Sequence, residues 1–322
     1  MRHKTILKVC NLSVSKKSNG KTMKLVRNMD FQLEQGGILG IVGEGGSGKE
    51  FLSEALLGLL DSKEHVLSGE ALYLEKDILS MNGQDLMKIR GREISRVSND
   101  AVKALNPHMT IGRQLDILKK HYGSECSRES IDEVLGNLGI EDLKGIRKAH
   151  ASGLGEELAY RILLAMAVIS KPKILIAEDP AFDFDGLKKK EILVLLKKVS
   201  IDYRISIILV TGDFDAARLV CDRIIIMYKG LIVEEGTVNQ LIENAGHPYS
   251  LGLVKSIESA VGNSEEMYFL DGGDTRLDEA QRRCPFAERC SRRKFYCMEE
   301  MPELSGEGIH KVRCLNPVGG AE

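Results

Sequence analysis

Apolar residues near the start of the chain occur in short runs separated by polar and turn residues. The runs at residues 6–9 and 38–42 are too short for helices and are typical of strands. The second run leads directly into a glycine-rich segment, after which residues 51–60 show an apolar pattern suited to a helix. The pattern therefore predicts a strand, a glycine-rich loop and a helix in succession.

The spacing changes between Asn82 and Ser170, where apolar positions recur every three to four residues. This period is typical of amphipathic helices. We therefore expect a helical insertion, whose clearest helices cover residues 111–122, 131–138 and 156–169.

After this insertion, short apolar runs again alternate with amphipathic stretches. Strands are expected at residues 174–177, 205–210, 224–228 and 231–235, with helices over 187–199 and up to Cys221. Apolar strands separated by helices indicate a largely parallel sheet covered on both faces, which is an α/β fold. Beyond Gly246 the chain becomes richer in Pro, Gly and Cys and is expected to form an irregular tail.

Composition narrows the classes of function. The chain has 322 residues and 43% hydrophobic content, which is enough for a full core. Its 45 Lys and Arg residues against 47 Asp and Glu give a net charge of -2, so no nucleic-acid partner is expected. No apolar run approaches the roughly 18 residues of a membrane span, and residues 1–9 lack the features of a secretory signal. We expect a cytoplasmic protein.

The glycine-rich segment matches GxxxxGK, a loop whose amides and lysine hold nucleotide phosphates at a helix N-terminus. Its residues are Gly43, Glu44, Gly45, Gly46, Ser47, Gly48, Lys49 and Glu50. The eighth position normally carries a Ser or Thr hydroxyl that binds Mg²⁺. Glu50 instead places a carboxylate beside the phosphates, which repels them unless it captures the metal itself. The alternative is a glycine-rich turn with a solvated lysine.

Six segments together resemble the ATP-binding subunits of oligopeptide and dipeptide ABC importers. They are GIVGEGGSGK, ALNPHMTIGRQ, AMAVISKPKILIAEDP, CDRIIIMYKGLIVEEGTV, HPYSLGL and CPFAERC. The resemblance spans almost the whole chain, and HPYSLGL with the cysteine tail is specific to the peptide and nickel branch. It implies an ABC-type nucleotide-binding domain with residues 1–83 and 171–245 as core, 84–170 as helical subdomain and 246–322 as C-terminal extension.

Residues aligned with the family's ATP-handling positions differ from the family pattern. Lys16 takes the place of the aromatic residue that stacks on adenine. Asn99 takes the place of the glutamine that senses Mg²⁺ and couples to the membrane subunits, and it is one methylene shorter. Gly212 occupies the position of the histidine that contacts the γ-phosphate, and glycine has no imidazole that could donate a hydrogen bond. The resemblance thus implies impaired handling of ATP.

The strand at 174–177 leads into Glu178 and Asp179, where the family has Asp and then Glu. In the family the first carboxylate holds Mg²⁺ through water and the second acts as the base on the attacking water. The charges are kept here, but both carboxylates are displaced. Because a displacement of roughly 1 Å costs on the order of 100-fold in rate, we expect Asp179 to be a weak base. The alternative is that the pair only caps a strand.

The family's signature motif, which contacts ATP on the opposite subunit, is also altered. A gapless alignment from Glu178 places it on Leu154, Gly155, Glu156 and Glu157, which sets two acidic groups at a helix N-terminus where phosphate normally binds. A small insertion permits Ser152, Gly153 and Gly155 instead. Lys49 is retained, as is Asp185, at the position that communicates across the dimer.

Four of the seven cysteines lie close together near the C-terminus: Cys284, Cys290, Cys297 and Cys314. Four thiolates can close a Zn²⁺ site or ligate an iron–sulfur cluster, and the family resemblance implies a 4Fe–4S cluster. A structural role in pinning the tail, redox sensing and unliganded buried thiols are the alternatives for this group.

The leading hypothesis is a subunit that hydrolyses little or no ATP. As the resemblance implies, it pairs with a second, competent ATPase subunit beneath two transmembrane permease subunits fed by a peptide-binding protein, at the cytoplasmic face of the membrane. One alternative is an active ATPase with a rearranged Mg²⁺ site formed by Glu50, Glu178 and Asp179. Another is a regulatory subunit based on an iron–sulfur cluster. The family's cofactors would be ATP and Mg²⁺, whose binding at this subunit's own site is doubtful from these substitutions.

Overall fold

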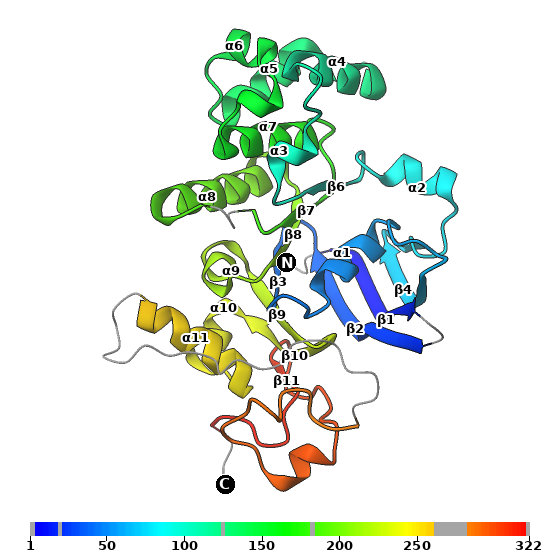
Figure 1. The fold of residues 1–322 in the computed structure, drawn as a ribbon, viewed down its shortest axis with the longest axis vertical. Coiled ribbons are helices and arrows are strands. Elements are labelled where there is room, and N and C mark those ends of the chain that lie inside the picture. The colour runs from blue at the N-terminus through cyan, green and yellow to red at the C-terminus, as the bar shows by residue number, and fades with distance from the viewer. Residues whose placement is uncertain (1–3, 19–20, 124–125, 181–183, 261–281, 320–322) are drawn as a thin grey trace. The chain divides into compact units, whose positions relative to one another are not determined.

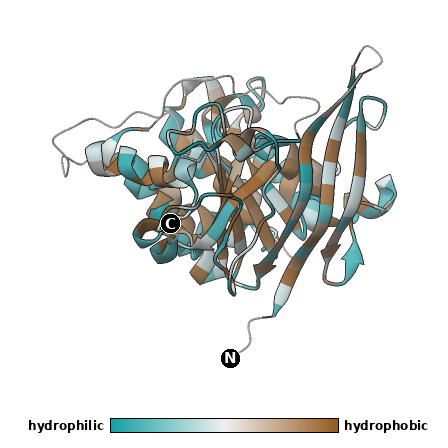
Figure 2. Ribbon diagram, turned by 90° about the horizontal axis from the view of Figure 1, so that it is seen from below, coloured by the Kyte–Doolittle hydropathy of each residue, from teal (hydrophilic) through white to brown (hydrophobic). Residues whose placement is uncertain are grey.

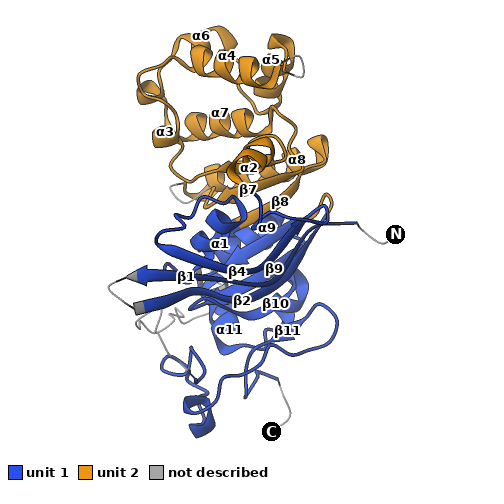
Figure 3. Cartoon of the chain, turned by 90° about the vertical axis from the view of Figure 1, so that its right-hand side faces the viewer, with its two compact units in different colours: residues 1–34, 38–81, 210–322 blue, residues 35–37, 82–209 orange. Residues whose placement is uncertain are grey.

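The computed structural model describes residues 4–18, 21–123, 126–180, 184–260 and 282–319. The chain forms two compact units. Unit 1 comprises residues 1–34, 38–81 and 210–322, and unit 2 comprises residues 35–37 and 82–209 (Figure 3). None of the helices within the described ranges combines the length and apolar character needed to cross a membrane.

Unit 1 contains an antiparallel sheet in the order β2-β1-β4-β5. Its strands are β1 (Thr5–Ser18), β2 (Lys21–Glu34), β4 (His65–Tyr73) and β5 (Lys76–Asp77). Along β1 the buried residues Val9, Leu12 and Val14 share one face because a register shift between Val9 and Leu12 corrects their odd spacing. Only residues 6–9 were expected as a strand here, since the irregular spacing hides the period of two.

A second group of strands in unit 1 runs in the order β11-β10-β9-β3. These are β3 (Ile38–Val42), β9 (Arg223–Tyr228), β10 (Leu231–Thr237) and β11 (Lys311–Val312). Strand β3 is parallel to β9, whereas β9 and β10 form an antiparallel hairpin. Lys229 and Gly230 both have positive φ, at 46° and 78°, which suits the tight two-residue turn between them.

The helices of unit 1 are mostly short. They are α1 (Lys49–Leu56), α9 (Phe214–Val220), α10 (Val238–Glu243), α11 (Pro248–Ala260) and the 3₁₀ helix η3 (Phe295–Met298). Helix α11 corrects the expectation that the chain is irregular directly after Gly246. Proline at its first position is compatible with a helix because that residue needs no N–H partner.

Unit 2 holds strands in the order β8-β7-β6, of which β6 and β7 are parallel, and most of the helices (Figure 1). The strands are β6 (Ile94–Val97), β7 (Ile174–Glu178) and β8 (Ser206–Thr211), whose last two residues belong to unit 1. The helices are α2 (Gly83–Ile89), α3 (Ala101–Ala104), α4 (Ile111–Tyr122), α5 (Arg128–Asn137), α6 (Leu143–Lys148), the 3₁₀ turn η2 (Ala151–Gly153), α7 (Glu156–Val168) and α8 (Gly186–Tyr203).

Local chemistry explains why the predicted helix at residues 111–122 agrees with α4 at both ends. The Thr110 hydroxyl accepts a hydrogen bond from the Arg113 N–H at its start, and Gly123, at φ 70°, follows its last turn. Figure 2 shows hydrophobic residues concentrated on the inner strands and hydrophilic residues on outer turns.

The parallel pairs β3–β9 and β6–β7 confirm the expected α/β class, and the antiparallel pairs make its sheets mixed.

Candidate functional site

The glycine-rich loop lies between β3 and α1, and several hydrogen bonds fix its backbone. The Gly43 N–H donates to the carbonyl of Thr211 at 3.2 Å, and the Ser47 carbonyl accepts from the Gly230 N–H at 2.8 Å. Gly45 and Gly46 are exposed between these anchors, while the Ser47 hydroxyl is buried without a hydrogen-bond partner in the described structure. The loop is therefore held at its ends and open in its middle, as a phosphate cradle needs to be.

Two glycines of the loop are required by close packing. A Cβ at Gly43 would come within 2.6 Å of the Met227 carbonyl oxygen. At Gly48 the backbone has φ 94°, and a Cβ would collide with the carbonyl oxygen of Leu25. Gly48 is the residue before α1, so the helix starts where only glycine fits without strain.

The lysine of the loop is already paired with the residue that follows it. Lys49 Nζ lies 2.7 Å from Glu50 Oε1, and the side chain of Lys49 is only 4% exposed. Glu50 itself is half exposed at 51%. The carboxylate expected to repel phosphate therefore also neutralises the cation that would attract phosphate.

Gly212 and Lys16 also belong to unit 1. Gly212 is exposed and lies near the loop, since a Cβ built on it would be 3.6 Å from the Gly43 carbonyl oxygen. No steric conflict explains the absence of a side chain there. Lys16 lies on β1 and makes a 3.5 Å ion pair with Glu64, with 43% of its side chain exposed.

In unit 2, Glu178 ends β7 and is bound by an arginine of the neighbouring strand β6. Arg96 approaches the same carboxylate oxygen, Glu178 Oε2, with Nε at 2.8 Å and Nη2 at 2.6 Å. The Glu178 side chain is 15% exposed, so the pair is largely withdrawn from water. Asp179 follows with φ 38°, a left-handed conformation that costs a non-glycine residue about 1–3 kcal/mol.

Asn99 lies just beyond β6, is exposed, and accepts a hydrogen bond from the Asp100 N–H at 2.9 Å. It lines a cavity of about 320 Å³ within unit 2, together with Lys103, Tyr160 and Phe184. The Tyr160 hydroxyl is buried with no hydrogen-bond partner in the described structure, and burial raises its pKa well above the ordinary value.

The gapless alignment places the altered signature motif at the start of α7. Gly155 is the residue before the helix and provides no side-chain cap, and Glu156 and Glu157 form the first turn. Glu157 accepts hydrogen bonds from Arg161 Nε at 3.0 Å and Nη2 at 2.9 Å, whereas Glu156 is exposed. Both carboxylates interact favourably with the helix dipole, because negative charge is stabilised at a helix N-terminus.

Asp185 precedes α8 and is exposed. It lines an open hollow of about 900 Å³ together with Gly155, Glu156, Glu157 and Lys188. Ser152 and Gly153 lie in the 3₁₀ turn η2, which precedes this helix start. The residues of the gapless alignment thus line the same hollow as Asp185. The choice between the two alignments stays a prediction.

The cysteine tail does not form the expected metal centre. Within the described residues, no group of three or more His, Cys, Asp or Glu side chains is placed to hold a metal ion. Burial raises the pKa of the Cys284 and Cys314 thiols to about 11 and also raises the pKa of Cys290. The expectation of a 4Fe–4S cluster, with zinc as its alternative, is therefore wrong for the described side chains, because their placement offers no such ligand group. The tail carries free thiols, with Cys284 and Cys297 buried.

A nucleotide's phosphates and its Mg²⁺ fit the described residues to different degrees. The exposed glycines, the buried Ser47 hydroxyl and the start of α1 suit phosphate oxygens. Glu50 and Glu178, the carboxylates expected near the metal, are each bound to a basic side chain of this chain. These residues therefore do not fit Mg²⁺ as they stand.

The sequence did not point to three residues that shape the site: Arg96, Tyr249 and Arg289. Arg289 binds Glu44 of the loop, and Tyr249 accepts a hydrogen bond from the Glu44 N–H. Tyr249 lies in the HPYSLGL segment and Arg289 in CPFAERC, so both motifs were noticed, but only as marks of resemblance. Nothing local in the sequence connects them to residue 44.

Family models match two parts of the chain. Residues 26–182 match the ABC transporter model, and residues 233–297 match the model of the oligopeptide/dipeptide transporter C-terminal region. The first match includes the glycine-rich loop and β7. The second runs from β10 to the third cysteine of the tail.

Curated relatives match almost the full length. The dipeptide transport ATP-binding protein of Bacillus subtilis is 33% identical over 96% of this chain and 94% of its own length. The oligopeptide transport ATP-binding protein of Haemophilus influenzae is 33% identical over 88% of this chain and 89% of its own length.

Solved structures share the fold at lower identity. A dimeric ATP-binding cassette bound to ADP and Pi superposes with a TM-score of 0.63 at 23% identity, covering 72% of this chain and 98% of that chain. A Clostridium perfringens protein described as part of an ABC transporter complex gives a TM-score of 0.64 at 22% identity, covering 80% and 98%. At this identity the likeness shows the ABC-type nucleotide-binding fold and nothing more.

Proposed function

Because this chain belongs to the family of peptide-transport ABC ATP-binding proteins, we propose that it is a nucleotide-binding subunit of an ABC peptide importer and contributes little or no ATP hydrolysis. Its role in the importer is then structural and regulatory. The glycine-rich loop binds the phosphates of ATP, and the chemical step takes place at a site completed by another subunit.

The ion pair between Lys49 and Glu50 carries this proposal. A lysine in this loop aids phosphoryl transfer by placing its positive charge on the phosphates. Here that charge is bound at 2.7 Å by a carboxylate of the same chain. Bound phosphate must therefore compete with Glu50 for Lys49.

Two further observations support weak hydrolysis. Gly212 offers no side-chain donor to the γ-phosphate, even though space for a side chain exists. Glu178, expected to help hold Mg²⁺, is engaged by Arg96. Enzymes of this kind accelerate the reaction mainly by stabilising the charge that develops in the transition state. The missing side chain at Gly212 and the pairing of Glu178 with Arg96 therefore weaken the chemical step itself.

We propose the partners that the family resemblance implies. A second ABC ATPase subunit pairs with this chain, two transmembrane permease subunits lie above them, and an extracytoplasmic peptide-binding protein delivers cargo. The chain then works at the cytoplasmic face of the membrane through the permeases. In this arrangement residues 1–83 and 171–245 act as the nucleotide-binding core, residues 84–170 as the helical subdomain and residues 246–322 as the C-terminal extension.

The decisive experiment measures ATP hydrolysis by the complex assembled with a catalytically complete second subunit. Asp179→Asn in this chain is expected to change the rate less than twofold, whereas Glu→Gln at the catalytic position of the second subunit should abolish most of it. Asp202→Asn, an exposed change on α8, is the matched control.

A large loss of hydrolysis from Asp179→Asn that Asp202→Asn does not reproduce would contradict the proposal. It would favour the alternative in which Glu50, Glu178 and Asp179 form a rearranged Mg²⁺ site that hydrolyses ATP.

A further inference from the structure

The glycine-rich loop has an anchor that comes from the C-terminal extension. Arg289 binds both carboxylate oxygens of Glu44, with Nη1 2.9 Å from Oε2 and Nη2 3.2 Å from Oε1. The backbone N–H of Glu44 donates to the Tyr249 hydroxyl at 3.2 Å. The second residue of the loop is therefore held through both its side chain and its backbone.

Arg289 is itself held firmly in place. Its guanidinium lies 5.7 Å from the ring centroids of Tyr228 and Phe286, and Nη1 contacts the Tyr228 hydroxyl at 3.4 Å. Only 7% of its side chain is exposed. A two-pronged, ring-stacked and largely buried arginine makes a rigid and specific contact, unlike a surface ion pair.

The aromatic rings around Arg289 form one cluster drawn from separate segments. Tyr228 ends β9, Tyr249 lies at the start of α11, and Phe286 belongs to the tail. The ring centroids are 5.0 Å apart for Tyr228 and Tyr249, 5.3 Å for Tyr228 and Phe286, and 5.5 Å for Tyr249 and Phe286. These spacings are typical of packed aromatic pairs.

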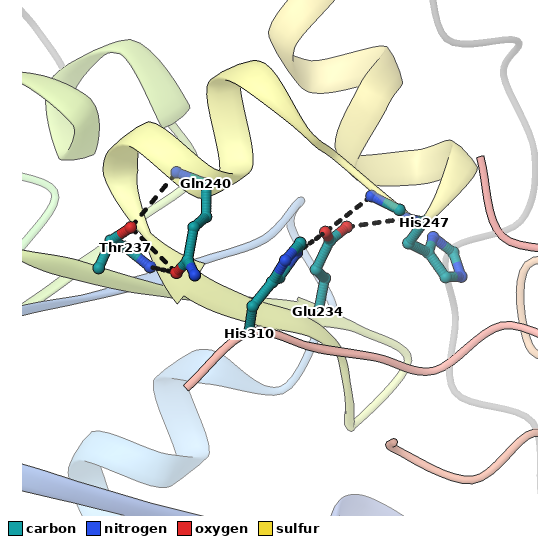
Figure 4. A network of polar contacts seen from close by, with 6 residues as sticks. Glu234, Thr237, Gln240, His247 and His310 are labelled. Carbon is teal, nitrogen blue, oxygen red and sulfur yellow. Dashed lines mark hydrogen bonds and ion pairs between the residues drawn. The ribbon is translucent and has the colours of Figure 1, made fainter. Parts of the chain in front are cut away.

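The extension is also attached to the sheet beneath it through Glu234 of β10 (Figure 4). This fully buried carboxylate accepts hydrogen bonds from the Gly246 and His247 N–H groups at 2.8 and 2.9 Å, and it contacts His310 Nε2 at 2.8 Å. The start of α11 and the tail thus share one anchor on β10. Arg289 and Tyr249 therefore contact Glu44 from an extension that is itself fixed to β10.

We propose that Arg289 is a positioning residue for the glycine-rich loop, through which the C-terminal extension sets the affinity of that loop for nucleotide. The inference rests on the proposed function in assuming that the ligand is ATP. Gly45 and Gly46 are exposed, and a Cβ at Gly45 would meet no atom within 4 Å, so packing holds the middle of the loop little and its conformation depends on anchors such as Glu44.

Loss of Arg289 acts against phosphate binding in two ways. The first half of the loop loses its main side-chain anchor, so binding has to order it again. The Glu44 carboxylate, only 29% exposed, also loses its counter-charge and becomes a net negative group next to the place for phosphates. Both effects weaken affinity, and the second disappears if Glu44 is made neutral.

The test compares the wild-type protein with Arg289→Gln, Glu44→Gln and the double variant, using Arg293→Gln as an exposed control from the same tail. Each is titrated with a ribose-labelled fluorescent ATP analogue. We expect about tenfold weaker binding for Arg289→Gln, a factor that corresponds to about 1.4 kcal/mol. In the Glu44→Gln background the further effect of Arg289→Gln should fall below twofold. Arg289→Lys should restore only part of the affinity, because an ammonium cannot bind both oxygens in a fork.

Hydrogen exchange of the amides of residues 43–48, measured without nucleotide, is the second readout. It should be faster in Arg289→Gln and unchanged in Arg293→Gln. Unaltered exchange together with unaltered affinity in Arg289→Gln would overturn the inference, as would an equal loss of affinity in the Glu44→Gln background. If the wild-type protein binds no analogue, the proposed function fails, while loop exchange still decides whether Arg289 positions the loop.

Discussion

Lys49 and Arg96 each make a short ion pair with a carboxylate at a position that the family uses for ATP or Mg²⁺. Lys49 pairs with its neighbour Glu50, and Arg96 pairs with Glu178. The Arg96–Glu178 pair is the more sheltered of the two, with side chains 31% and 15% exposed, whereas in the other pair Lys49 is buried at 4% and Glu50 is 51% exposed. Breaking a sheltered pair leaves a charge without compensation, which costs more than breaking a surface pair. A metal ion bound by Glu178 would first have to meet the cost of separating this carboxylate from Arg96.

Replacing Glu50 with Ser should reverse the effect at Lys49. The change releases the ammonium, removes a negative charge next to the phosphates and supplies the hydroxyl usual at this position. We expect affinity for the fluorescent ATP analogue to rise by about tenfold, which equals about 1.4 kcal/mol. Glu54→Ser, on the same helix, is the matched control and should leave the affinity within twofold. Equal affinity in Glu50→Ser and the wild type would show that the pair does not restrain binding.

At the scale of elements, the start of α1 depends on the backbone of one glycine. Gly48 has φ 94°, and its α-carbon faces the carbonyl of Leu25 on β2. The loop, the helix and the strand therefore pack together only if position 48 lacks a side chain. The match to GxxxxGK identified this glycine, but its contact with β2 was not predictable, because β2 itself was not expected.

Gly48→Ala should lower the free energy of unfolding by at least about 2 kcal/mol, since it adds both a strained φ and a clash. Gly45→Ala provides the control within the same loop, because a Cβ there meets no atom within 4 Å. Urea unfolding of the two variants measures the difference. Equal midpoints for Gly48→Ala and Gly45→Ala would contradict the packing described for α1.

At the scale of the whole molecule, the C-terminal extension is part of unit 1 and bears on its stability. His247 is buried, and its Nδ1 accepts a hydrogen bond from the Tyr249 N–H at 3.1 Å. Burial, together with the charge of Arg313, lowers the pKa of His247 to about 3. The neutral imidazole is thus the form that the folded protein holds, whereas the unfolded chain takes up a proton near pH 6.5.

Stability from His247 is therefore present above about pH 6.5 and declines as the pH falls towards 3, by about 1.4 kcal/mol per pH unit. In His247→Asn the amide oxygen can replace Nδ1 as acceptor without titrating. The stability advantage of the wild type over this variant should shrink by about 2 kcal/mol between pH 7 and pH 5, as measured by urea unfolding at both values. The exposed His108→Asn provides the control, and an advantage that is the same at both pH values would exclude this role for His247.

The local features of this protein follow from the order of its residues. The period of apolar residues predicted α4, α7, β3 and β7 nearly to the residue, since that period follows from local backbone geometry. The glycine-rich loop and the substitutions at Glu50 and Gly212 were likewise readable in sequence order.

Which charges from distant segments meet depends on how the whole chain packs. Arg96 and Glu178 are 82 positions apart, and Glu44 and Arg289 are 245 positions apart, so no local period connects them. The same holds for the four cysteines of the tail, whose spacing allowed a metal site that the placement of the described side chains does not form. Ion pairs, aromatic clusters and metal sites depend on where distant segments pack, and that is set by the whole fold.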